Sequence, residues 1–455
     1  MRENLGGALL PRNFKIDSRC VNEGDGFIAV AGARDNGHNY IKNAIESGAV
    51  CVLLEREFYE KHIETLSNFE AMFLSAEDTV ASAAKLARAW LDEVSPRVIG
   101  ITGSVGKTTT REFLNKALEK SFRTHSAIKS YNTLIGTAMT VLAMPKDTEI
   151  LILELGANHP GEISALVEHF PVTHSVITEV TDAHLEGFND IKGVLDAKME
   201  ITGSRRLEYL SYNSDNDLLS SAVVKMPNGE KFRKDGIKQV GVGYSSSNIR
   251  ISDVRQYVGE GLTPILSLSL SENDRKVFCE APVFGRQHAK NIAFAYAVAI
   301  QMGMTDGDFE LAASNFKVPS GRGVIGRGKN GCILLDETYN ANPSSVSHAI
   351  KNVLEMELTG DIKRIAILGG MRELGLESDR LHEVILSRAA LLDEIYLIGS
   401  EWNVTSKKYE SIKGVWKSAD DFIADFGFGS VERAVILLKG SRFYGMERIL
   451  PYLEG

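Results

Sequence analysis

One short segment constrains the fold of this chain more than any other. It reads Gly100-Ile101-Thr102-Gly103-Ser104-Val105-Gly106-Lys107-Thr108-Thr109-Thr110. An apolar run at 98–101 leads into it, and a helical pattern follows over 111–120. A glycine-rich turn between a strand and a helix is the setting of phosphate-binding loops, because backbone N–H groups and the helix start face the anion. The segment therefore predicts a nucleotide site on an α/β sheet.

The side chains of this loop suit a triphosphate. Lys107 offers a charge to the outer phosphates, and the Thr108 hydroxyl suits Mg²⁺. Ile101 stands where the longer loop pattern has its first glycine, so the loop is the compact Gly-x-x-Gly-Lys-Thr form. The alternative is a glycine-rich turn with an incidental lysine. We predict that ATP or GTP is bound by the following residues: Gly103, Ser104, Val105, Gly106, Lys107, Thr108 and Thr109.

Length and strand pattern predict an α/β protein of three domains. A chain of 455 residues exceeds one ordinary core. Residues 1–95 mix short apolar runs with turn signals and end in helical spacing over 79–94, which Ser95-Pro96 interrupts. We expect a smaller N-terminal α/β domain here.

The other two parts show strand-helix alternation. Residues 96–320 hold continuous apolar runs at 150–155 and 175–178, which favour a parallel sheet covered on both faces. This part is predicted to be a central phosphate-loop domain, with a small antiparallel insertion over 204–282. Residues 321–455 repeat the alternation, which predicts a C-terminal Rossmann-like domain.

Composition narrows the class of protein. The net charge of −9 argues against a general binder of nucleic-acid backbones. The four cysteines are scattered without metal-ligand spacing, as in a reducing compartment. No signal-peptide core and no apolar run near the roughly 20 residues of a membrane span are visible. We expect a cytoplasmic protein.

Several separate motifs occur in one order along the chain. They include Glu-Leu-Gly-Ala-Asn-His-Pro-Gly-Glu-Ile at 154–163 and Asp-Glu-Thr-Tyr-Asn-Ala-Asn-Pro at 336–343. Further stretches lie at 17–19, 24–29, 37–38, 102–109, 183–188, 197–201, 368–375 and 439–442. Together they resemble the Mur ligase family over nearly the whole chain.

The resemblance implies a reaction. Such a ligase uses ATP and Mg²⁺ to activate a carboxylate as an acyl phosphate and joins it to an amine, in the synthesis of cytoplasmic peptidoglycan precursors. The Asp-Asn-Pro-Arg signature of the diamino-acid-adding ligases is absent. This favours the branch that adds D-Ala-D-Ala to UDP-N-acetylmuramoyl-tripeptide. We expect a monomer that takes these small molecules and neither binds nucleic acid nor enters a membrane.

The resemblance also implies metal and catalytic roles. Glu154 ends a predicted strand, where a carboxylate can reach nucleotide-bound Mg²⁺; it could instead cap a turn. His184 is implied as a metal or substrate ligand, whereas a lone histidine is more often a surface or core residue. Lys198 is implied to be carbamylated, which makes it a metal ligand, although most such lysines are simply solvated. With Lys107 these form the predicted catalytic set.

Other residues are implied to hold substrates. Asn291 would contact adenine, although alone it suggests a helix cap. Arg322 near the phosphates and Asp336 near the ribose would complete the ATP site, or form interface ion pairs. Two pairs remain. The resemblance implies that residues 1–95 are the UDP-substrate-binding domain, in which Ser18 and Arg19 would hold the diphosphate. Tyr339 and Asn340 would shape the pocket for the dipeptide, although their segment also suits an ordinary turn.

Three positions depart from the family pattern. Thr133 and Leu134 stand where Asn and Glu are expected, and Gly370 replaces an expected Asp. These changes keep three alternatives open: a Mur-type ligase for a different amine, a phosphate-loop ATPase that acts through partner proteins, and an inactive ATP-binding relative.

Overall fold

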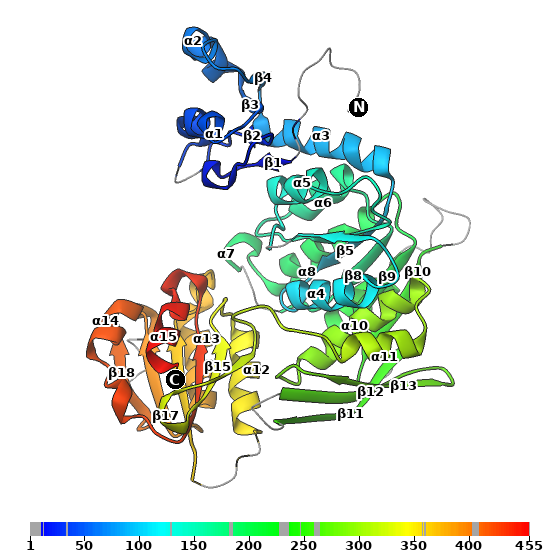
Figure 1. Cartoon of the computed structure of the whole chain (residues 1–455). Helices are drawn as coiled ribbons and strands as arrows, with labels where there is room; N and C mark the ends of the chain where they lie inside the picture. The colour runs from blue at the N-terminus through cyan, green and yellow to red at the C-terminus, as the bar shows by residue number, and fades with distance from the viewer. Residues whose placement is uncertain are drawn as a thin grey trace.

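The structure is a computed structural model of the chain (Figure 1). It describes residues 11, 13–32, 35–127, 130–181, 185–226, 236–245, 247–258, 264–356, 358, 361–402 and 409–454. In this part of the chain the strands form three sheets, of four, nine and six strands. The fold is mixed α/β, as predicted.

The N-terminal sheet is small and parallel, in the order β1-β2-β3-β4. Its elements are β1 (Phe14–Lys15), β2 (Gly26–Ile28), α1 (Ile41–Glu46), β3 (Cys51–Glu55), α2 (Arg56–Leu66), β4 (Met72–Ala76) and α3 (Thr79–Val94). The α3 helix has the predicted bounds: Asp78 accepts a hydrogen bond from Ala81 N, and Ser95 ends the helix in a left-handed conformation. Trp90 donates to Met144 O across 2.9 Å, so α3 joins this sheet to the central part.

The central sheet runs β13-β12-β11-β10-β9-β8-β5-β7-β6. Its strands are β5 (Arg97–Thr102), β6 (Thr124–Ser126), β7 (Ile150–Glu154), β8 (His174–Ile177), β9 (Tyr209–Asn213), β10 (Lys238–Gly243), β11 (Ile249–Val258), β12 (Pro264–Glu272) and β13 (Arg275–Ala281). Its helices are α4 (Lys107–Leu118), α5 (Leu134–Leu142), α6 (Glu162–His169), α7 (Leu185–Phe188), α8 (Ile191–Met199), α9 (Asp217–Val224), α10 (His288–Gln301) and α11 (Asp306–Ala313).

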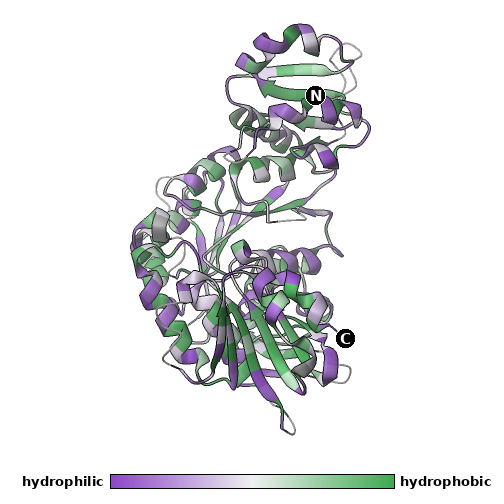
Figure 2. Cartoon of the chain, turned by 90° about the vertical axis from the view of Figure 1, so that its left-hand side faces the viewer, coloured by the Kyte–Doolittle hydropathy of each residue, from purple (hydrophilic) through white to green (hydrophobic). Residues whose placement is uncertain are grey.

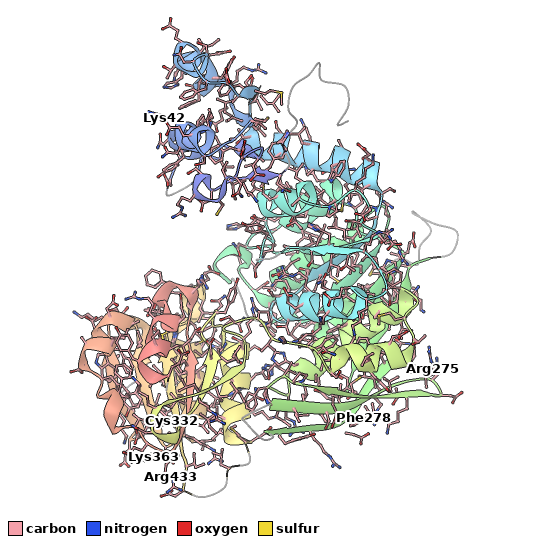
Figure 3. The ribbon with its side chains drawn as sticks, viewed as in Figure 1. Lys42, Arg275, Phe278, Cys332, Lys363 and Arg433 are labelled. Atoms are coloured by element: carbon pink, nitrogen blue, oxygen red, sulfur yellow. The ribbon has the colours of Figure 1, made fainter. Side chains whose placement is uncertain are left out.

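The prediction of a separate antiparallel insertion over 204–282 is wrong in part. The β9 and β10 strands pair in parallel with β8 and each other, and β11 also lies parallel to β10. Among the described residues of this segment, the antiparallel pairs are β11–β12 and β12–β13, and these strands extend the same sheet rather than forming their own. The β9 and β10 strands have only five and six residues, so the order of apolar and polar residues within them does not reveal that they pair in parallel. At the sheet edge, β13 presents Phe278 to solvent, with 52% of the residue exposed (Figure 3).

The C-terminal sheet has the order β14-β15-β19-β16-β17-β18, parallel except for the edge strand β14. Its strands are β14 (Val324–Arg327), β15 (Ile333–Glu337), β16 (Lys363–Gly369), β17 (Glu394–Ile398), β18 (Ile412–Trp416) and β19 (Ala434–Lys439). Its helices are α12 (Pro343–Leu354), α13 (Ser378–Ala389), α14 (Ala419–Asp425) and α15 (Leu450–Leu453). The predicted strands near 332, 364, 394 and 434 are confirmed.

Apolar residues concentrate in the strands, and the helices show mixed surfaces (Figure 2). The β5 and β7 strands are almost wholly buried, as expected for parallel strands covered on both faces. In the described chain we find no helix with the length and apolar character needed to span a bilayer.

Candidate active site

The predicted phosphate loop connects β5 to α4. Gly103 and Gly106 have φ angles of 141° and 87°, which favour glycine. A Cβ at Gly103 would lie 2.1 Å from Thr178 Oγ1, and one at Gly106 would lie 2.7 Å from Asn291 Oδ1. Helix α4 begins at Lys107 directly after the loop. The loop therefore has the backbone shape of an anion-binding turn in front of a helix N-terminus.

The end of β8 fixes the loop from behind. Thr178 donates its hydroxyl hydrogen toward Val105 O at 2.5 Å and lies 3.2 Å from Thr102 O. Ser104 N donates to Glu179 O at 2.8 Å. The sequence pattern does not identify Thr178 or Glu179 as residues that support the phosphate loop. The position of Thr178 at the carboxyl end of a strand beside β5 was the available signal.

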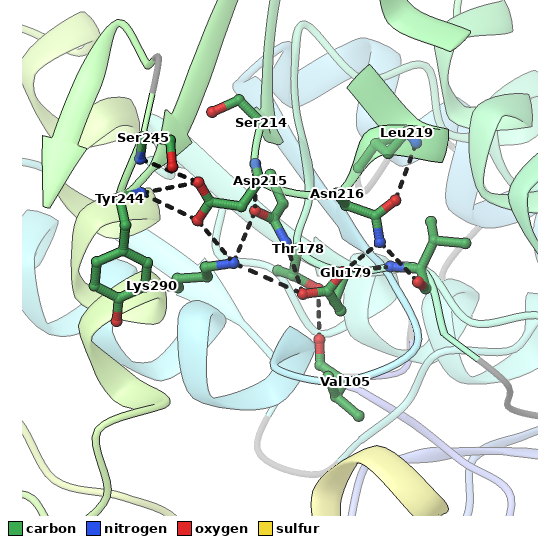
Figure 4. Close-up of polar contacts among 12 residues, drawn as sticks. Val105, Thr178, Glu179, Ser214, Asp215, Asn216, Leu219, Tyr244, Ser245 and Lys290 are labelled. Carbon is green, nitrogen blue, oxygen red and sulfur yellow. Dashed lines mark hydrogen bonds and ion pairs between the residues drawn. The ribbon is translucent and has the colours of Figure 1, made fainter. Parts of the chain in front are cut away.

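Glu179 is itself held by a polar network (Figure 4). Asn213 and Asn216 each donate to its carboxylate at 2.6 Å. Lys290 lies 3.9 Å from Glu179 Oε2 and 3.1 Å from Asp215 Oδ2. The network connects the end of β8 to the end of β9 and to α10. Three elements therefore fix the position of Glu179, which in turn holds the phosphate loop.

Lys107 is the cation of the loop. Its Nζ donates to Gly103 O at 2.5 Å. Burial lowers the pKa of Lys107, the charge of Glu154 opposes this shift, and the charge of Arg322 adds to it. Lys107 and Arg322, from the C-terminal part, line the same cleft, and two cations there favour a polyanion.

Glu154, at the end of β7, faces the start of α4. Its Oε2 accepts a hydrogen bond from the Thr108 hydroxyl at 2.9 Å and lies 3.6 Å from Arg111 Nη1. The Glu154 and Arg111 side chains are 2% and 1% exposed. The described residues contain no group of three or more His, Cys, Asp or Glu poised for a metal. One carboxylate and one hydroxyl beside a phosphate loop fit Mg²⁺, which takes its remaining ligands from phosphates and water.

Asn291 lies in the first turn of α10 rather than at its cap, because the helix begins at His288 after Gln287. The helix-cap interpretation is therefore wrong. Asn291 Oδ1 accepts from the Thr110 hydroxyl at 3.3 Å, and its Nδ2 lies 3.1 Å from His288 Nδ1. Burial lowers the pKa of His288 to about 4, so its ring is neutral and Nδ1 can accept. These contacts join α10 to the phosphate-loop helix.

Arg322 and Tyr339 reach the site from the C-terminal part. The Arg322 guanidinium lies over the Tyr339 ring, 4.0 Å from its centroid. Within the described residues, the buried Arg322 Nε has no hydrogen-bond acceptor. Asp336 is already engaged: its carboxylate accepts from Gly321 N at 3.0 Å and from the Thr338 hydroxyl at 2.6 Å. It holds together the segments that carry Arg322 and Tyr339.

Lys198 is almost fully buried, at 1% exposure. It lies in the last turn of α8. Its Nζ is 3.4 Å from Ala157 O, and the Phe188 ring centroid is 5.4 Å away. Burial and the charge of Lys107 lower the pKa of Lys198 to about 7, against weaker opposition from Glu200 and Glu162. The solvated-lysine interpretation is therefore wrong.

Some of the predicted site residues lie apart from the phosphate loop and its neighbours, and one is not among the residues that the structure describes. His184 falls outside the described residues. Ser18 and Arg19 lie in the N-terminal part and do not line the cleft; Arg19 Nη2 pairs with Asp17 Oδ2 at 2.7 Å. Asn340 lines the cleft in the turn that leads into α12. Thr133, one of the departures, caps α5.

One cleft connects the phosphate loop and Glu154 with Arg322 and Tyr339, whereas Lys198 and Asp336 do not line it. Its volume is about 1630 Å³, and residues of the central and C-terminal parts line it. The chain is acidic overall, yet the cleft has more basic than acidic side chains. The basic ones are Lys107, Arg286, Lys290, Arg322, Lys351, Arg372, Lys439 and Arg442; the acidic ones are Glu154, Glu162, Glu179, Glu337, Glu355 and Glu373. Anionic ligands fit this cleft best.

A phosphate loop with an acidic strand end and a cationic cleft against a second α/β sheet defines a nucleotide-dependent enzyme. Comparison with known proteins specifies the class further. Residues 12–90 match the Mur ligase family catalytic domain, and residues 101–299 match the Mur ligase middle domain. The chain belongs to the Mur ligase family.

Curated relatives and solved structures agree. The UDP-N-acetylmuramoyl-tripeptide–D-alanyl-D-alanine ligase of Bacillus subtilis is 30% identical, with 81% of this chain and 75% of the relative covered. The Escherichia coli ligase of the same name is 28% identical, with 96% and 92% covered. The crystal structure of MurF ligase from Thermotoga maritima in complex with ADP has a TM-score of 0.80 and 28% identity, with 98% of each chain covered. The crystal structure of MurF from Acinetobacter baumannii shares the fold, with a TM-score of 0.81 and 23% identity. The match covers 96% of this chain and 92% of the Acinetobacter baumannii chain.

Proposed function

We propose that this chain is an ATP-dependent ligase that adds D-Ala-D-Ala to UDP-N-acetylmuramoyl-tripeptide. The observation that carries the proposal is the cleft that Lys107 of the phosphate loop and Arg322 from the C-terminal part line together. The names of the curated relatives support the substrates, and the ADP complex of the Thermotoga maritima ligase supports the nucleotide. Membership in the family supports amide formation as the reaction.

The nucleotide would lie along the phosphate loop. Its phosphates would accept from the loop amides of residues 103–109 and from Lys107, and Arg322 Nε would find its acceptor there. Asn291, beside Gly106, would face the adenine end. Asp336 would act mainly by holding the Arg322 segment, and its ribose contact remains part of the proposal.

Thr108 and Glu154 would hold Mg²⁺, which would neutralise charge on the phosphates. His184 and Lys198 are proposed for a second metal position. Lys198 supports this role because its pKa of about 7 leaves a large neutral fraction, and only a neutral amine can react with CO₂. The product would be a carbamate, an anionic oxygen ligand.

The chemistry follows from crowded negative charge. A carboxylate oxygen of the tripeptide would attack the γ-phosphorus, and ADP would leave with the β–γ bridging oxygen. The dipeptide amine would then attack the acyl carbon, lose a proton, and expel phosphate that carries one former carboxylate oxygen. Lys107 and Arg322 would offset the charge on the transferred group, and closing the cleft would exclude water from the acyl phosphate.

The remaining parts of the proposal concern the periphery. We propose domain limits at 1–95, 96–320 and 321–455, with Ser18 and Arg19 binding the UDP diphosphate in the first. Arg19 would need to exchange its Asp17 partner for phosphate. Tyr339 and Asn340 would line the dipeptide pocket. A cytoplasmic monomer is the proposed working form.

The test is product analysis. The purified chain receives UDP-linked tripeptide, ATP, Mg²⁺ and either D-Ala-D-Ala or single amino acids, and mass spectrometry identifies the product. We expect the pentapeptide product only with D-Ala-D-Ala, with one phosphate released per amide, and its loss in Lys107→Ala. Product from a single amino acid would assign another Mur-type activity. Hydrolysis of ATP without either acid or amine would favour an ATPase.

A further inference from the structure

A charged cluster on the C-terminal wall of the cleft is not used by the steps above. Arg372 Nη1 donates to Glu401 Oε1 at 3.0 Å, and its guanidinium lies 4.7 Å from the centroid of the Phe443 ring. Arg372 and Phe443 line the cleft, whereas Glu401 lies behind them. The side-chain exposures are 51% for Arg372 and 14% for Glu401, so a half-buried carboxylate holds an exposed guanidinium.

Gly370 makes room for this carboxylate. A Cβ at Gly370 would lie 2.8 Å from Glu401 Oε2 and 3.1 Å from Tyr444 Cε2. The Tyr444 hydroxyl donates to the same Glu401 oxygen. Gly370 is one of the departures found in the sequence, where an aspartate is expected. The carboxylate of Glu401 therefore occupies the space beside position 370 that a side chain there would need.

The topology places the cluster at a ligand-binding edge. Gly370 and Arg372 follow β16, Glu401 follows β17, and Arg442 follows β19, and these three strands are neighbours in one parallel sheet. Open parallel α/β sheets bind ligands at the carboxyl ends of their strands. The cluster thus faces the cleft from the edge where a substrate is expected.

The cluster has capacity for an anion. A guanidinium carries five N–H donors, and Glu401 accepts one hydrogen bond from Nη1 of Arg372. The Arg442 guanidinium lies on the same wall, 5.4 Å from the centroid of the Tyr339 ring. No carboxylate among the described residues forms an ion pair with Arg442. Among the C-terminal side chains that line the cleft, five are basic and three are acidic, so with Glu401 behind them the wall keeps a net charge of +1.

We propose that Arg372 binds the α-carboxylate of the incoming dipeptide and that Glu401 is the residue that positions Arg372; this rests on the proposed function. For the phosphates, Lys107 lies on the central side of the cleft, and Arg322 lies over the Tyr339 ring on the C-terminal side. Two extended residues span only about 7 Å. A dipeptide whose amine reaches the acyl carbon must therefore leave its carboxylate on a nearby wall, and Arg372 supplies paired donors there.

The test compares D-Ala-D-Ala with its C-terminal amide, which lacks the carboxylate charge. In the wild type, kcat/KM should favour the acid by about tenfold to a hundredfold, the range for one hydrogen bond to a charged group. In Arg372→Gln the preference should fall to near unity. Because each ratio is measured within one variant, the amount of folded enzyme cancels.

Glu401→Gln tests the positioning role. We expect a severalfold higher KM for the dipeptide with KM for ATP unchanged. Glu394→Gln is the matched control. The Glu394 side chain is 18% exposed, and it accepts hydrogen bonds from one cation, Lys363, and from the Tyr396 hydroxyl. Lys363 and Glu394 lie at the amino ends of β16 and β17, the strands whose carboxyl ends carry Arg372 and Glu401. Glu394→Gln should leave both KM values unchanged. Glu401→Ala combined with Gly370→Asp should recover part of the acid preference that Glu401→Ala loses.

The outcomes separate the two proposals. A wild type that forms no amide from D-Ala-D-Ala overturns the proposed function and this inference with it. An active wild type whose Arg372→Gln variant keeps the full acid preference overturns the inference alone. An increase in the KM for ATP equal to that for the dipeptide in Glu401→Gln would show a general structural role instead.

Discussion

Thr178 offers a sharp test of how the phosphate loop is shaped. Its side chain is buried, at 3% exposure, and its hydroxyl donates toward Val105 O at 2.5 Å. Thr178→Val keeps the shape of the side chain and removes the hydroxyl. Thr178→Ser keeps the hydroxyl and removes a methyl group. The pair separates hydrogen bonding from packing.

The expected magnitude follows from the contacts. Thr102 O keeps a second donor, Thr178 N at 3.0 Å, whereas Val105 O loses the hydroxyl. Leaving a buried carbonyl without its donor costs about 1–3 kcal/mol. If that cost falls on the nucleotide-bound loop, the Kd for ADP rises by roughly fivefold to a hundredfold.

Calorimetric titration with ADP and Mg²⁺ measures this Kd, and thermal denaturation records any loss that falls on the free protein instead. Thr178→Ser should stay within about threefold of the wild type, a difference below 1 kcal/mol. The reasoning is refuted if Thr178→Val binds ADP as tightly as the wild type and melts at the same temperature.

Three further predictions concern buried groups. Because a protonated amine cannot react with CO₂, turnover in bicarbonate-free buffer should fall as pH drops below the Lys198 pKa of about 7, and added bicarbonate should restore phosphate release. Glu154→Gln removes one of two carboxylates beside buried Arg111, which keeps its ion pair with Glu112, so urea unfolding should show a loss of about 1.5 kcal/mol, and the Mg²⁺ requirement should rise. Gly103→Ala places a Cβ 2.1 Å from Thr178 Oγ1 at a φ of 141°, which should lower the melting temperature and weaken ADP binding more than tenfold.

Local features of this fold follow directly from the sequence. The α3 helix has its predicted bounds because Asp78 and Ser95 supply both ends within the segment itself. The phosphate loop is equally local, since its glycines and Lys107 are contiguous. The parallel pairing of β9 and β10 was missed because it depends on β8, a neighbour that the local pattern does not identify.

The candidate site divides in the same way. Lys107, Thr108 and Glu154 meet because two adjacent parallel strands, β5 and β7, end at the same edge. The supports, Thr178 and Glu401, come from other strand ends and have no distinctive pattern around them. Gly370 was visible as a departure in the sequence, but only the structure shows which side chain takes the space.

The central claim is that the tripeptide carboxylate takes the γ-phosphoryl group of ATP before the amine attacks. UDP-linked tripeptide with ¹⁸O in the reacting carboxylate, incubated with D-Ala-D-Ala, ATP and this enzyme, tests it by mass spectrometry of the released phosphate. The account predicts one carboxylate-derived ¹⁸O in each phosphate and one phosphate per amide. Unlabelled phosphate accompanying amide formation would contradict it.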